Sequence, residues 1–242
     1  MINLGLIGFG RFGQFAAQHL RRHMHVFVWD MRDLRKKAAS PGMTWGTLEE
    51  AASCQIVVLA VPVSEVPIAL AQVVPWLRPG AILMDVCSVK MLPVEWMTAA
   101  APPEVEVVGT HPLFGPRSGR SGINGLTIAI CPVRTRRAER IRRFLEGLGL
   151  NVVLTTPEEH DRQLAYAQAL THFVARGLTA SGVREQALMT PSFEKMLRLI
   201  EPLAREHPKL FRDMQQHNPY AAEVRARFMD ALRQLDTGME EE

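Results

Sequence analysis

Short apolar runs alternate with amphipathic stretches over the first 155 residues of the chain. The runs are rich in β-branched residues, and several are almost continuously apolar, as expected for strands covered by helices on both faces. They predict strands at residues 2–7, 25–29, 55–60, 81–85, 105–109, 126–131 and 152–154. The stretches between them predict helices, among them residues 12–20, 65–74 and 136–148. This alternation predicts an α/β domain with a doubly wound, mostly parallel sheet.

The pattern changes after Pro157, beyond which the residues favour helix and no strand is predicted. Residues 158–183 predict one helix of about 40 Å at 1.5 Å per residue. Thr190 and Pro191 predict the cap and first turn of another helix. Three prolines then divide the remainder into shorter helices: Pro202, Pro208 and Pro219. We therefore predict two domains, an α/β domain over residues 1–155 and an all-α domain over residues 156–242.

The long predicted helix carries an apolar stripe on one face, made by Leu164, Ala167, Leu170, Val174 and Leu178. A helical segment of about 85 residues rarely forms an independent core. We therefore expect part of the stripe to be buried against a second copy of the chain, so that the helical domain forms a homodimer.

Composition excludes several classes of protein. The chain is 47% hydrophobic and 22% charged, as globular proteins are, and no apolar run approaches a membrane span. The first residues lead directly into a strand, so we predict a cytoplasmic protein without a signal peptide. Cys54, Cys87 and Cys131 are odd in number and lack a Cys-x-x-Cys pair, which argues against disulfides and against a metal site.

Six arginines crowd residues 134–143, and the chain carries a net charge of +3. Apolar residues recur among these arginines at helical spacing, which places the arginines on the solvated face of an amphipathic helix. Because no aromatic side chains are interleaved for base stacking, we predict no nucleic-acid partner.

A glycine-rich loop follows the first predicted strand and opens a helix, which is the setting that a dinucleotide-binding fingerprint requires. The loop reads Gly8-Phe9-Gly10-Arg11-Phe12-Gly13. Its glycines permit a tight turn, close approach of a pyrophosphate, and close packing of helix on strand. The helix N-terminus supplies free N–H groups for the phosphates. This is the fingerprint of a Rossmann-type domain.

Asp30 closes the second strand twenty residues beyond Gly10, where a carboxylate can accept hydrogen bonds from an adenine ribose. It favours NAD over NADP, although Arg32 and Arg35 follow closely and could weaken that preference. Val61 and Pro62, which follow the strand at residues 55–60, complete the predicted cofactor site.

Three further segments carry chemistry-bearing residues: Asp85–Lys90 and Gly109–Pro116 at the ends of strands, and residues 159–173 in the long helix. In an open α/β sheet, ligands bind at the carboxyl ends of the strands. Together the segments resemble prephenate dehydrogenase and its relatives arogenate and cyclohexadienyl dehydrogenase. The most specific runs are His-Pro-x-Phe-Gly-Pro from His111 and His-Asp…Gln-Ala-Leu-x-His-Phe from His160.

Members of that family oxidatively decarboxylate prephenate or arogenate, giving 4-hydroxyphenylpyruvate or tyrosine, CO2 and reduced nicotinamide. The resemblance implies that His111 is the catalytic histidine, that Ser88 is its partner, and that His172 lines the substrate pocket. Gln168, one turn before His172, points the same way and is expected to orient it. A neutral imidazole suits the removal of a hydroxyl proton at physiological pH.

Structural roles for the same residues stay open at this point. A histidine before proline can simply close a turn, and Ser88 can cap the following helix. His172 can be a structural group in a helical core. We expect Lys90 to belong to the scaffold of its loop or to the edge of the cofactor site, and His160 and Asp161 to brace the long helix.

The chain departs from the family pattern in its helical domain. Relatives carry an arginine that pairs with the ring carboxylate of the substrate, and Pro202 stands at that position here. A second family arginine is replaced by Glu194. Because a buried carboxylate needs a cation, another arginine must take over, and Arg198 is the first candidate, followed by Arg205 and Arg117. A substrate such as 4-amino-4-deoxyprephenate would also fit the departure.

We therefore predict an NAD-dependent oxidoreductase of tyrosine biosynthesis that acts on prephenate, with arogenate or an amino analogue as alternative substrates. A β-hydroxy-acid dehydrogenase is a second enzymatic interpretation, but that group uses a lysine in its helical domain and lacks the His-Pro-x-Phe-Gly-Pro loop. An NAD-sensing module is the non-enzymatic alternative, which would need the glycine loop but no proton acceptor.

Overall fold

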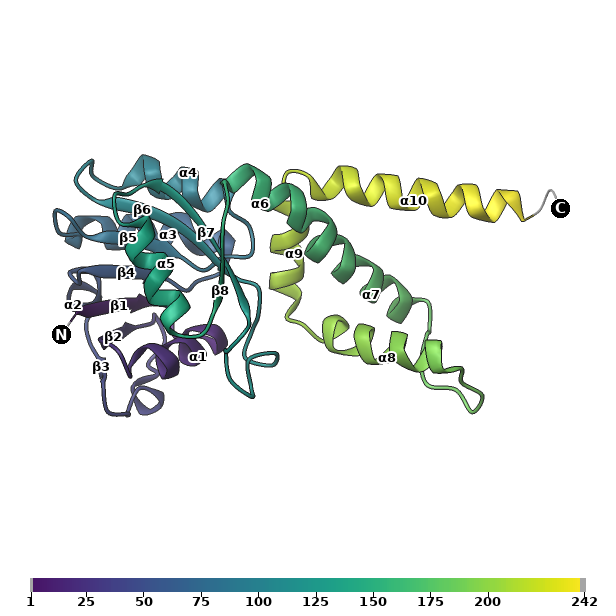
Figure 1. The fold of residues 1–242 in the computed structure, drawn as a ribbon, viewed down its shortest axis with the longest axis horizontal. Coiled ribbons are helices and arrows are strands. Elements are labelled where there is room, and N and C mark those ends of the chain that lie inside the picture. The colour runs from purple at the N-terminus through teal and green to yellow at the C-terminus, as the bar shows by residue number, and fades with distance from the viewer. Residues whose placement is uncertain (1, 240–242) are drawn as a thin grey trace. The chain divides into compact units, whose positions relative to one another are not determined.

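The computed structural model describes residues 2–239 and divides the chain into two compact units, Met1–His160 and Asp161–Glu242 (Figure 1). Residues 240–242, at the end of the predicted second domain, lie outside the described part. No helix of the described residues is long and apolar enough to cross a membrane.

The first unit is built on an eight-stranded sheet with the order β3-β2-β1-β4-β5-β6-β7-β8. All neighbouring strands run parallel except β6 and β7, which pair antiparallel. The strands are β1 Asn3–Ile7, β2 His25–Trp29, β3 Met43–Trp45, β4 Ile56–Leu59, β5 Ile82–Asp85, β6 Glu106–Pro112, β7 Thr127–Arg134 and β8 Asn151–Leu154. The mostly parallel sheet confirms the predicted fold class, and β3 is a short edge strand that the apolar pattern did not predict.

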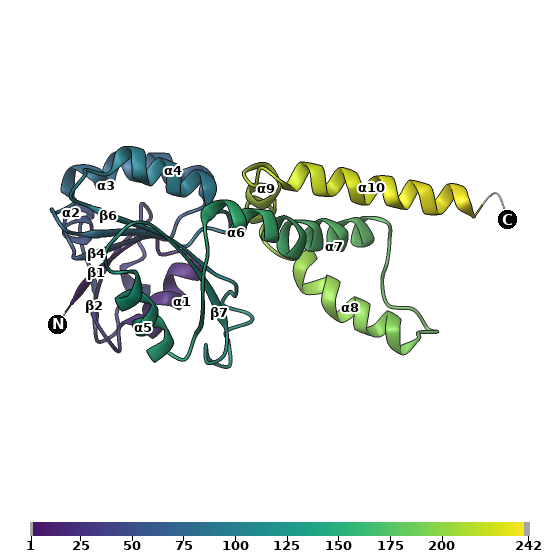
Figure 2. The ribbon, with the colours of Figure 1, turned by 45° about the horizontal axis from the view of Figure 1, so that its top comes forward.

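Helices cover both faces of this sheet because successive strand residues point to opposite sides. Leu6 packs with Ala17 of α1 in one core cluster, whereas its neighbour Ile7 packs with Val66 of α3 in another. Figure 2 shows α3 and α4 above the sheet and α1 and α5 below it. The helices are α1 Arg11–Leu20, α2 Leu48–Ala52, α3 Val66–Val73, α4 Met91–Ala100 and α5 Ala138–Gly147.

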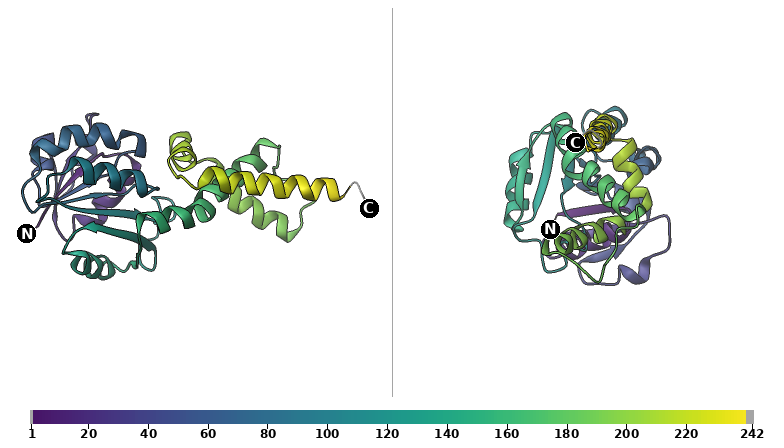
Figure 3. Two further views of the ribbon diagram at one scale, coloured as in Figure 1. Left: turned by 90° about the horizontal axis from the view of Figure 1, so that it is seen from above. Right: turned by 90° about the vertical axis from the view of Figure 1, so that its right-hand side faces the viewer.

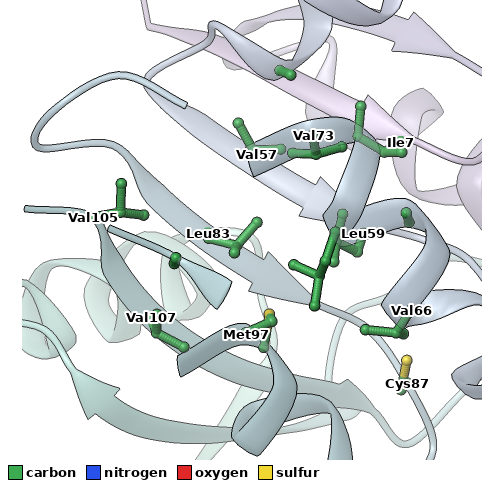
Figure 4. Packing of buried hydrophobic residues seen from close by; sticks show 14 of the residues in the cluster. Ile7, Val57, Leu59, Val66, Val73, Leu83, Cys87, Met97, Val105 and Val107 are labelled. Carbon is green, nitrogen blue, oxygen red and sulfur yellow. The ribbon is translucent and has the colours of Figure 1, made fainter. Parts of the chain in front are cut away.

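The larger core lies between the sheet and α2, α3 and α4. Figure 4 shows Leu83 and Leu59 of the strands meeting Val66 and Met97 of the helices. Side chains of this size each contribute about 1.5–3 kcal/mol when fully buried. The core therefore fixes the strands whose carboxyl ends carry the candidate chemistry.

The second unit is helical, as predicted. Its elements are α7 Thr171–Ala180, α8 Pro191–Ala204, α9 Pro208–Gln216 and α10 Ala221–Gly238, preceded by α6 Pro157–Leu164, which begins in the first unit. Figure 3 shows α10 as a single uninterrupted helix. The prediction that Pro202 separates two helices is wrong, because Pro202 lies inside α8.

The predicted helix over residues 158–183 differs from the observed one in its middle and at its end. A π-helical segment, Ala165–Leu170, joins α6 to α7, and α7 ends at Ala180. The hydroxyl of Thr171 donates to the backbone carbonyls of Tyr166 (3.3 Å) and Ala167 (3.1 Å) at the end of this segment. Such single π turns inside α-helices are frequent at functional sites.

Candidate active site

The glycine-rich loop connects β1 to α1 and leaves its backbone open to a ligand. Gly8 has φ +101°, and a Cβ there would lie 2.5 Å from the carbonyl oxygen of Ala60. A Cβ at Gly13 would lie 2.2 Å from the carbonyl oxygen of Gly8, so both positions need glycine. Gly10 caps α1, and no atom lies within 4 Å of where its Cβ would stand. This combination fits a pyrophosphate at the helix N-terminus.

Asp30 holds this loop in place. Its carboxylate is almost fully buried and accepts hydrogen bonds from the backbone N–H of Phe9 (2.7 Å) and from Arg32, through the backbone N–H (2.9 Å) and Nε (3.0 Å). Burial raises the pKa of Asp30, but the hydrogen bonds from Arg32 and Phe9 outweigh it and leave the pKa lowered. Asp30 is therefore an ionised hydrogen-bond acceptor, although Arg32 already donates hydrogen bonds to its carboxylate.

The other predicted cofactor residues surround the same loop. Phe9 is fully buried, Phe12 is half-buried and Arg11 is exposed at the first turn of α1. Val61 is half-buried beside Gly8, and Pro62 is exposed. Both follow β4, which pairs with β1 where the strand order reverses, and open α/β sheets bind ligands at this point.

A buried ion pair joins the ends of β5 and β6. Asp85 and Lys90 both have 0% exposed side chains, and Lys90 Nζ pairs with Asp85 Oδ2. Lys90 Nζ also donates to the carbonyl oxygen of Thr110 (2.7 Å), and Asp85 accepts the backbone N–H groups of Thr110 (3.3 Å) and Cys87 (2.9 Å). Lys90 thus belongs to the scaffold that ties the loop containing Ser88 to the strand that carries His111.

His111 lies near the end of β6 and is 4% exposed. Its neighbours Thr110 and Pro112 line an apolar cavity of about 670 Å³ beside α1 and α5. Because side chains alternate along a strand, His111 points to the opposite face, the face on which Lys90 packs against Gly109. The cavity is therefore separated from the imidazole by the strand itself.

A second buried histidine contacts His111. His160 of α6 is 2% exposed, and its Nε2 lies 2.9 Å from Nδ1 of His111, with the ring centroids 5.1 Å apart. Burial, the nearby His160 and Lys90 together lower the pKa of His111 well below its usual value. His111 is therefore neutral at physiological pH, and its Nε2 has no partner among the described residues.

Ser88 is 7% exposed, and its buried Oγ has no hydrogen-bond partner within residues 2–239. It does not cap the next helix, because Lys90 is the N-cap of α4 and no side chain caps that helix. Ser88 lies in the loop that follows β5, and His111 lies near the end of the neighbouring strand β6, but no hydrogen bond joins their side chains in the described structure.

The predicted residues of the helical unit differ in their surroundings. His172 is 7% exposed, and its Nδ1 has no partner in the described part of the chain. Gln168 lies half-buried in the π segment. Arg198 has a side chain that is 66% exposed and pairs with Glu194 on the same helix. Arg205 is 73% exposed and pairs with Glu201, and Arg117 is exposed in a loop of the first unit.

Two residues of interest were not assigned a binding or catalytic role from the sequence. His160 was expected only to brace the long helix, and its contact with His111 joins residues 49 positions apart. Arg176 lies one helical turn after His172 and has a buried Nε without a partner. The sequence signal for His160 was its place in the motif that runs from His160 to Phe173, which did not specify a contact, and Arg176 lies just beyond that motif. No group of three or more His, Cys, Asp or Glu among residues 2–239 is arranged to hold a metal ion.

Comparison with protein families places this geometry among known folds. The family model described as prephenate dehydrogenase, nucleotide-binding domain, matches residues 16–154, and prephenate dehydrogenase, dimerization domain, matches residues 156–242. A probable arogenate/prephenate dehydrogenase of Methanocaldococcus jannaschii is 28% identical over 92% of this chain and 53% of its own length. Arogenate dehydrogenase 2, chloroplastic, of Arabidopsis thaliana is 30% identical over 99% of this chain and 68% of its length.

The chain spans only part of the length of such relatives. It covers 53% of the Methanocaldococcus jannaschii protein and 39% of another relative, arogenate dehydrogenase 1, chloroplastic, of Arabidopsis thaliana. A solved structure, prephenate dehydrogenase from A. aeolicus in complex with hydroxyphenyl propionate and NAD+, has a TM-score of 0.77. It is 23% identical and covers 100% of this chain and 93% of its own, so it shows the fold.

We predict that Lys90→Met lowers the free energy of unfolding by about 3–5 kcal/mol, because it leaves Asp85 buried without a counter-charge. The double variant Asp85→Asn/Lys90→Met should recover part of this loss, since both charges are then gone. Urea denaturation of Lys90→Met, Asp85→Asn and the double variant measures the coupling. Arg142→Met is the control, because Arg142 is partly exposed, pairs with Glu139 and Glu146 on the surface of α5, and should change the stability little. A loss for Lys90→Met no larger than that of the control contradicts the role of the pair.

Proposed function

Because the chain belongs to the prephenate dehydrogenase family, an oxidoreductase family, we propose that it oxidatively decarboxylates prephenate to 4-hydroxyphenylpyruvate with NAD as the hydride acceptor. The observation that carries this proposal is the neutral, buried His111 with Nε2 unpartnered within the described residues. A base of this kind is what removal of a ring hydroxyl proton requires. An NAD-sensing module would have no use for it.

The tautomer of His111 follows from its partner. For Nε2 to accept a proton, the neutral ring must carry its own proton on Nδ1, and that N–H then donates to His160 Nε2 at 2.9 Å. His160 would therefore hold the ring as a base and stabilise the imidazolium that forms. We propose His160 as a positioning residue, since it acts through His111.

In the proposed reaction His111 Nε2 takes the proton of the C4 hydroxyl as hydride leaves C4, which produces a ring ketone. The bond from C1 to the ring carboxylate then breaks, CO2 departs, and its electron pair makes the ring aromatic. His111 returns its proton to the phenolate oxygen. Ser88 Oγ is proposed to hold the C4 oxygen in line through a hydrogen bond.

The residues that would hold the cofactor are the glycine loop, Asp30, and Val61 with Pro62 at the neighbouring strand end. The nicotinamide would supply the hydride acceptor when bound. The remaining contribution of the chain is to position the reactants and to keep His111 neutral.

Arogenate is the second candidate substrate, because it differs from prephenate only in an amino group on the side chain. The relatives carry both names, and a 4-amino-4-deoxyprephenate dehydrogenase of Streptomyces pristinaespiralis is 30% identical over 78% of this chain and 65% of its own. An assay must therefore offer prephenate, arogenate and the amino analogue separately.

We also propose that the enzyme acts as a homodimer through its helical unit. The family model of this unit is a dimerization domain. Leu199 of α8 and Leu232 and Leu235 of α10 expose 44–62% of their surface, which a second copy would cover.

The proposal predicts that the wild-type protein reduces NAD with prephenate, followed as absorbance of reduced nicotinamide, and that His111→Asn lowers kcat by roughly 10²–10⁴ while binding NAD normally. His25→Asn is the control, since His25 is a partly buried histidine bonded to Thr44 on neighbouring strands. Full turnover by His111→Asn would remove the proposed base. Absence of turnover with all three substrates would overturn the proposed function.

The pKa of His111 is lowered, and only the neutral ring is a base. We therefore predict that kcat/KM is maintained down to pH 6.5 and falls only at a pH well below that value. His160→Gln should make kcat/KM fall at a higher pH than in the wild type, because it removes a group that lowers the pKa of His111. The introduced amide oxygen can still accept a hydrogen bond from Nδ1 of His111. His160→Leu offers no acceptor and should lose about tenfold or more in kcat. Equal kcat in the Gln and Leu variants would contradict the positioning role.

Asp30 leads us to predict a kcat/KM at least about tenfold higher with NAD than with NADP. Asp30→Asn should narrow this ratio, since a neutral amide no longer repels a 2′-phosphate and leaves Arg32 free to bind it. Asp33→Asn is the control, because Asp33 is exposed and pairs with Arg35. A wild-type preference for NADP would refute the assignment.

A further inference from the structure

The apolar cavity of the first unit lies between the sheet and the helices α1 and α5, which cover the same face of the sheet (Figure 2). Its floor consists of alternate residues of β1, β4 and β5, which point to one side of the sheet: Leu4, Leu6, Ile56, Val58, Ile82 and Met84. The cavity follows β4 over residues 56–60 and β5 over residues 82–86, a length of about 13 Å at 3.3 Å per residue. The volume of about 670 Å³ is typical of a small-molecule site, and the length along the strands suits an extended ligand.

The sides of this cavity are also apolar. Phe15 of α1 lines it on one side, and Ile141 and Leu145 of α5 line it on the other. Beyond the end of α1, the ring of His23 meets that of Phe144 in α5 edge to face, with 6.1 Å between their centroids. Burial of an extended apolar chain between these side chains is favourable because it removes the chain from water.

The charged residues of the lining are all arginines: Arg78, Arg137 and Arg140. No aspartate or glutamate of the described residues lines the cavity. Arg137 donates through Nη1 to the carbonyl oxygen of Gly80 (3.0 Å), so the start of α5 lies beside the segment that leads into β5. The three arginines therefore gather where β5 begins, and we call this the cationic end of the cavity.

Two of these three arginines remain available to an anion. Nε of Arg137 lies 3.3 Å from a carboxylate oxygen of Glu106. Arg78 and Arg140 form no ion pair with a carboxylate anywhere in residues 2–239. Guanidinium groups bind carboxylates through paired, charge-assisted hydrogen bonds.

We propose that this cavity binds an amphipathic carboxylate such as a fatty acid of medium length. The alkyl chain lies along the sheet between α1 and α5, and the carboxylate lies at the cationic end, where Arg78 and Arg140 bind it. Strand β6 separates the cavity from His111, so this ligand is additional to the substrate and the cofactor. The site needs only the first unit and does not depend on the proposed reaction.

The first test is calorimetric titration of the full chain with dodecanoate, below the concentration at which it forms micelles. Each buried methylene should tighten binding roughly 3- to 4-fold, so octanoate should bind about 100-fold more weakly. Dodecyltrimethylammonium has the same alkyl chain with the opposite charge, and should not bind over the same range of concentration. Equal binding of the two dodecyl compounds would contradict recognition of a carboxylate.

The double variant Arg78→Gln/Arg140→Gln should weaken the binding of dodecanoate about 10- to 100-fold, since two charged donors are lost. Arg136→Gln/Arg143→Gln is the matched control. It removes the same charge from the start of α5 and from α5 itself, but neither residue lines the cavity. The control should bind dodecanoate as the wild type does, and an equal loss in both double variants would overturn the assignment of the cationic end.

Methionine methyl NMR locates the bound chain. Met24 and Met84 line the cavity, whereas Met97 is fully buried against the opposite face of the sheet, with Val66 of α3. Dodecanoate should shift the methyl signals of Met24 and Met84 and leave those of Met97, and of Met214 in the helical unit, in place. The signals are assigned by methionine-to-leucine substitution. Failure of dodecanoate to bind, or binding that leaves Met24 and Met84 unshifted, would overturn the proposal.

Discussion

Asp85 and Lys90 carry opposite charges into a part of the sheet that water does not reach. Each charge would be costly there alone, and the pair is stable because backbone groups of Cys87 and Thr110 complete its hydrogen bonds. Those partners belong to the loop that contains Ser88 and to the strand that carries His111. The ion pair therefore constrains the two segments from which the candidate catalytic groups project.

The positive charge of Lys90 also acts on His111. Lys90 contributes to the lowered pKa of His111, after burial and His160. The buried cation of Lys90 disfavours protonation of His111. In the proposed tautomer, His160 accepts the Nδ1 proton of His111 and leaves its Nε2 as the proton acceptor.

Much of the fold could be predicted from the sequence, because apolar runs covered on both faces are a strong local signal. Strand β3 was missed because its three residues at the sheet edge carry little apolar periodicity. The π segment Ala165–Leu170 was missed because a single wider turn hardly changes the spacing of apolar residues along a helix. Pro202 was expected to end a helix, yet its place in the last turn of α8 leaves little of the helix beyond it to disrupt.

Residue type and a place at strand ends were enough to predict a cofactor role for the glycine loop and Asp30, whereas the catalytic role of His111 was implied by the family resemblance. These roles stay predictions. The contact between His160 and His111 could not be predicted from the sequence, because it joins residues 49 positions apart. The exposure of Arg198 likewise depends on the face that α8 buries, which Leu197 and Ile200 define.

We propose that His111 is a neutral base whose Nδ1 proton is held by His160. Nitrogen-15 NMR of imidazole-labelled protein tests it directly, with the His111 signals assigned by their loss in His111→Asn. At pH 7 we expect a protonated Nδ1 and an Nε2 with the chemical shift of an unprotonated nitrogen. A proton on Nε2, or an imidazolium at that pH, would contradict it.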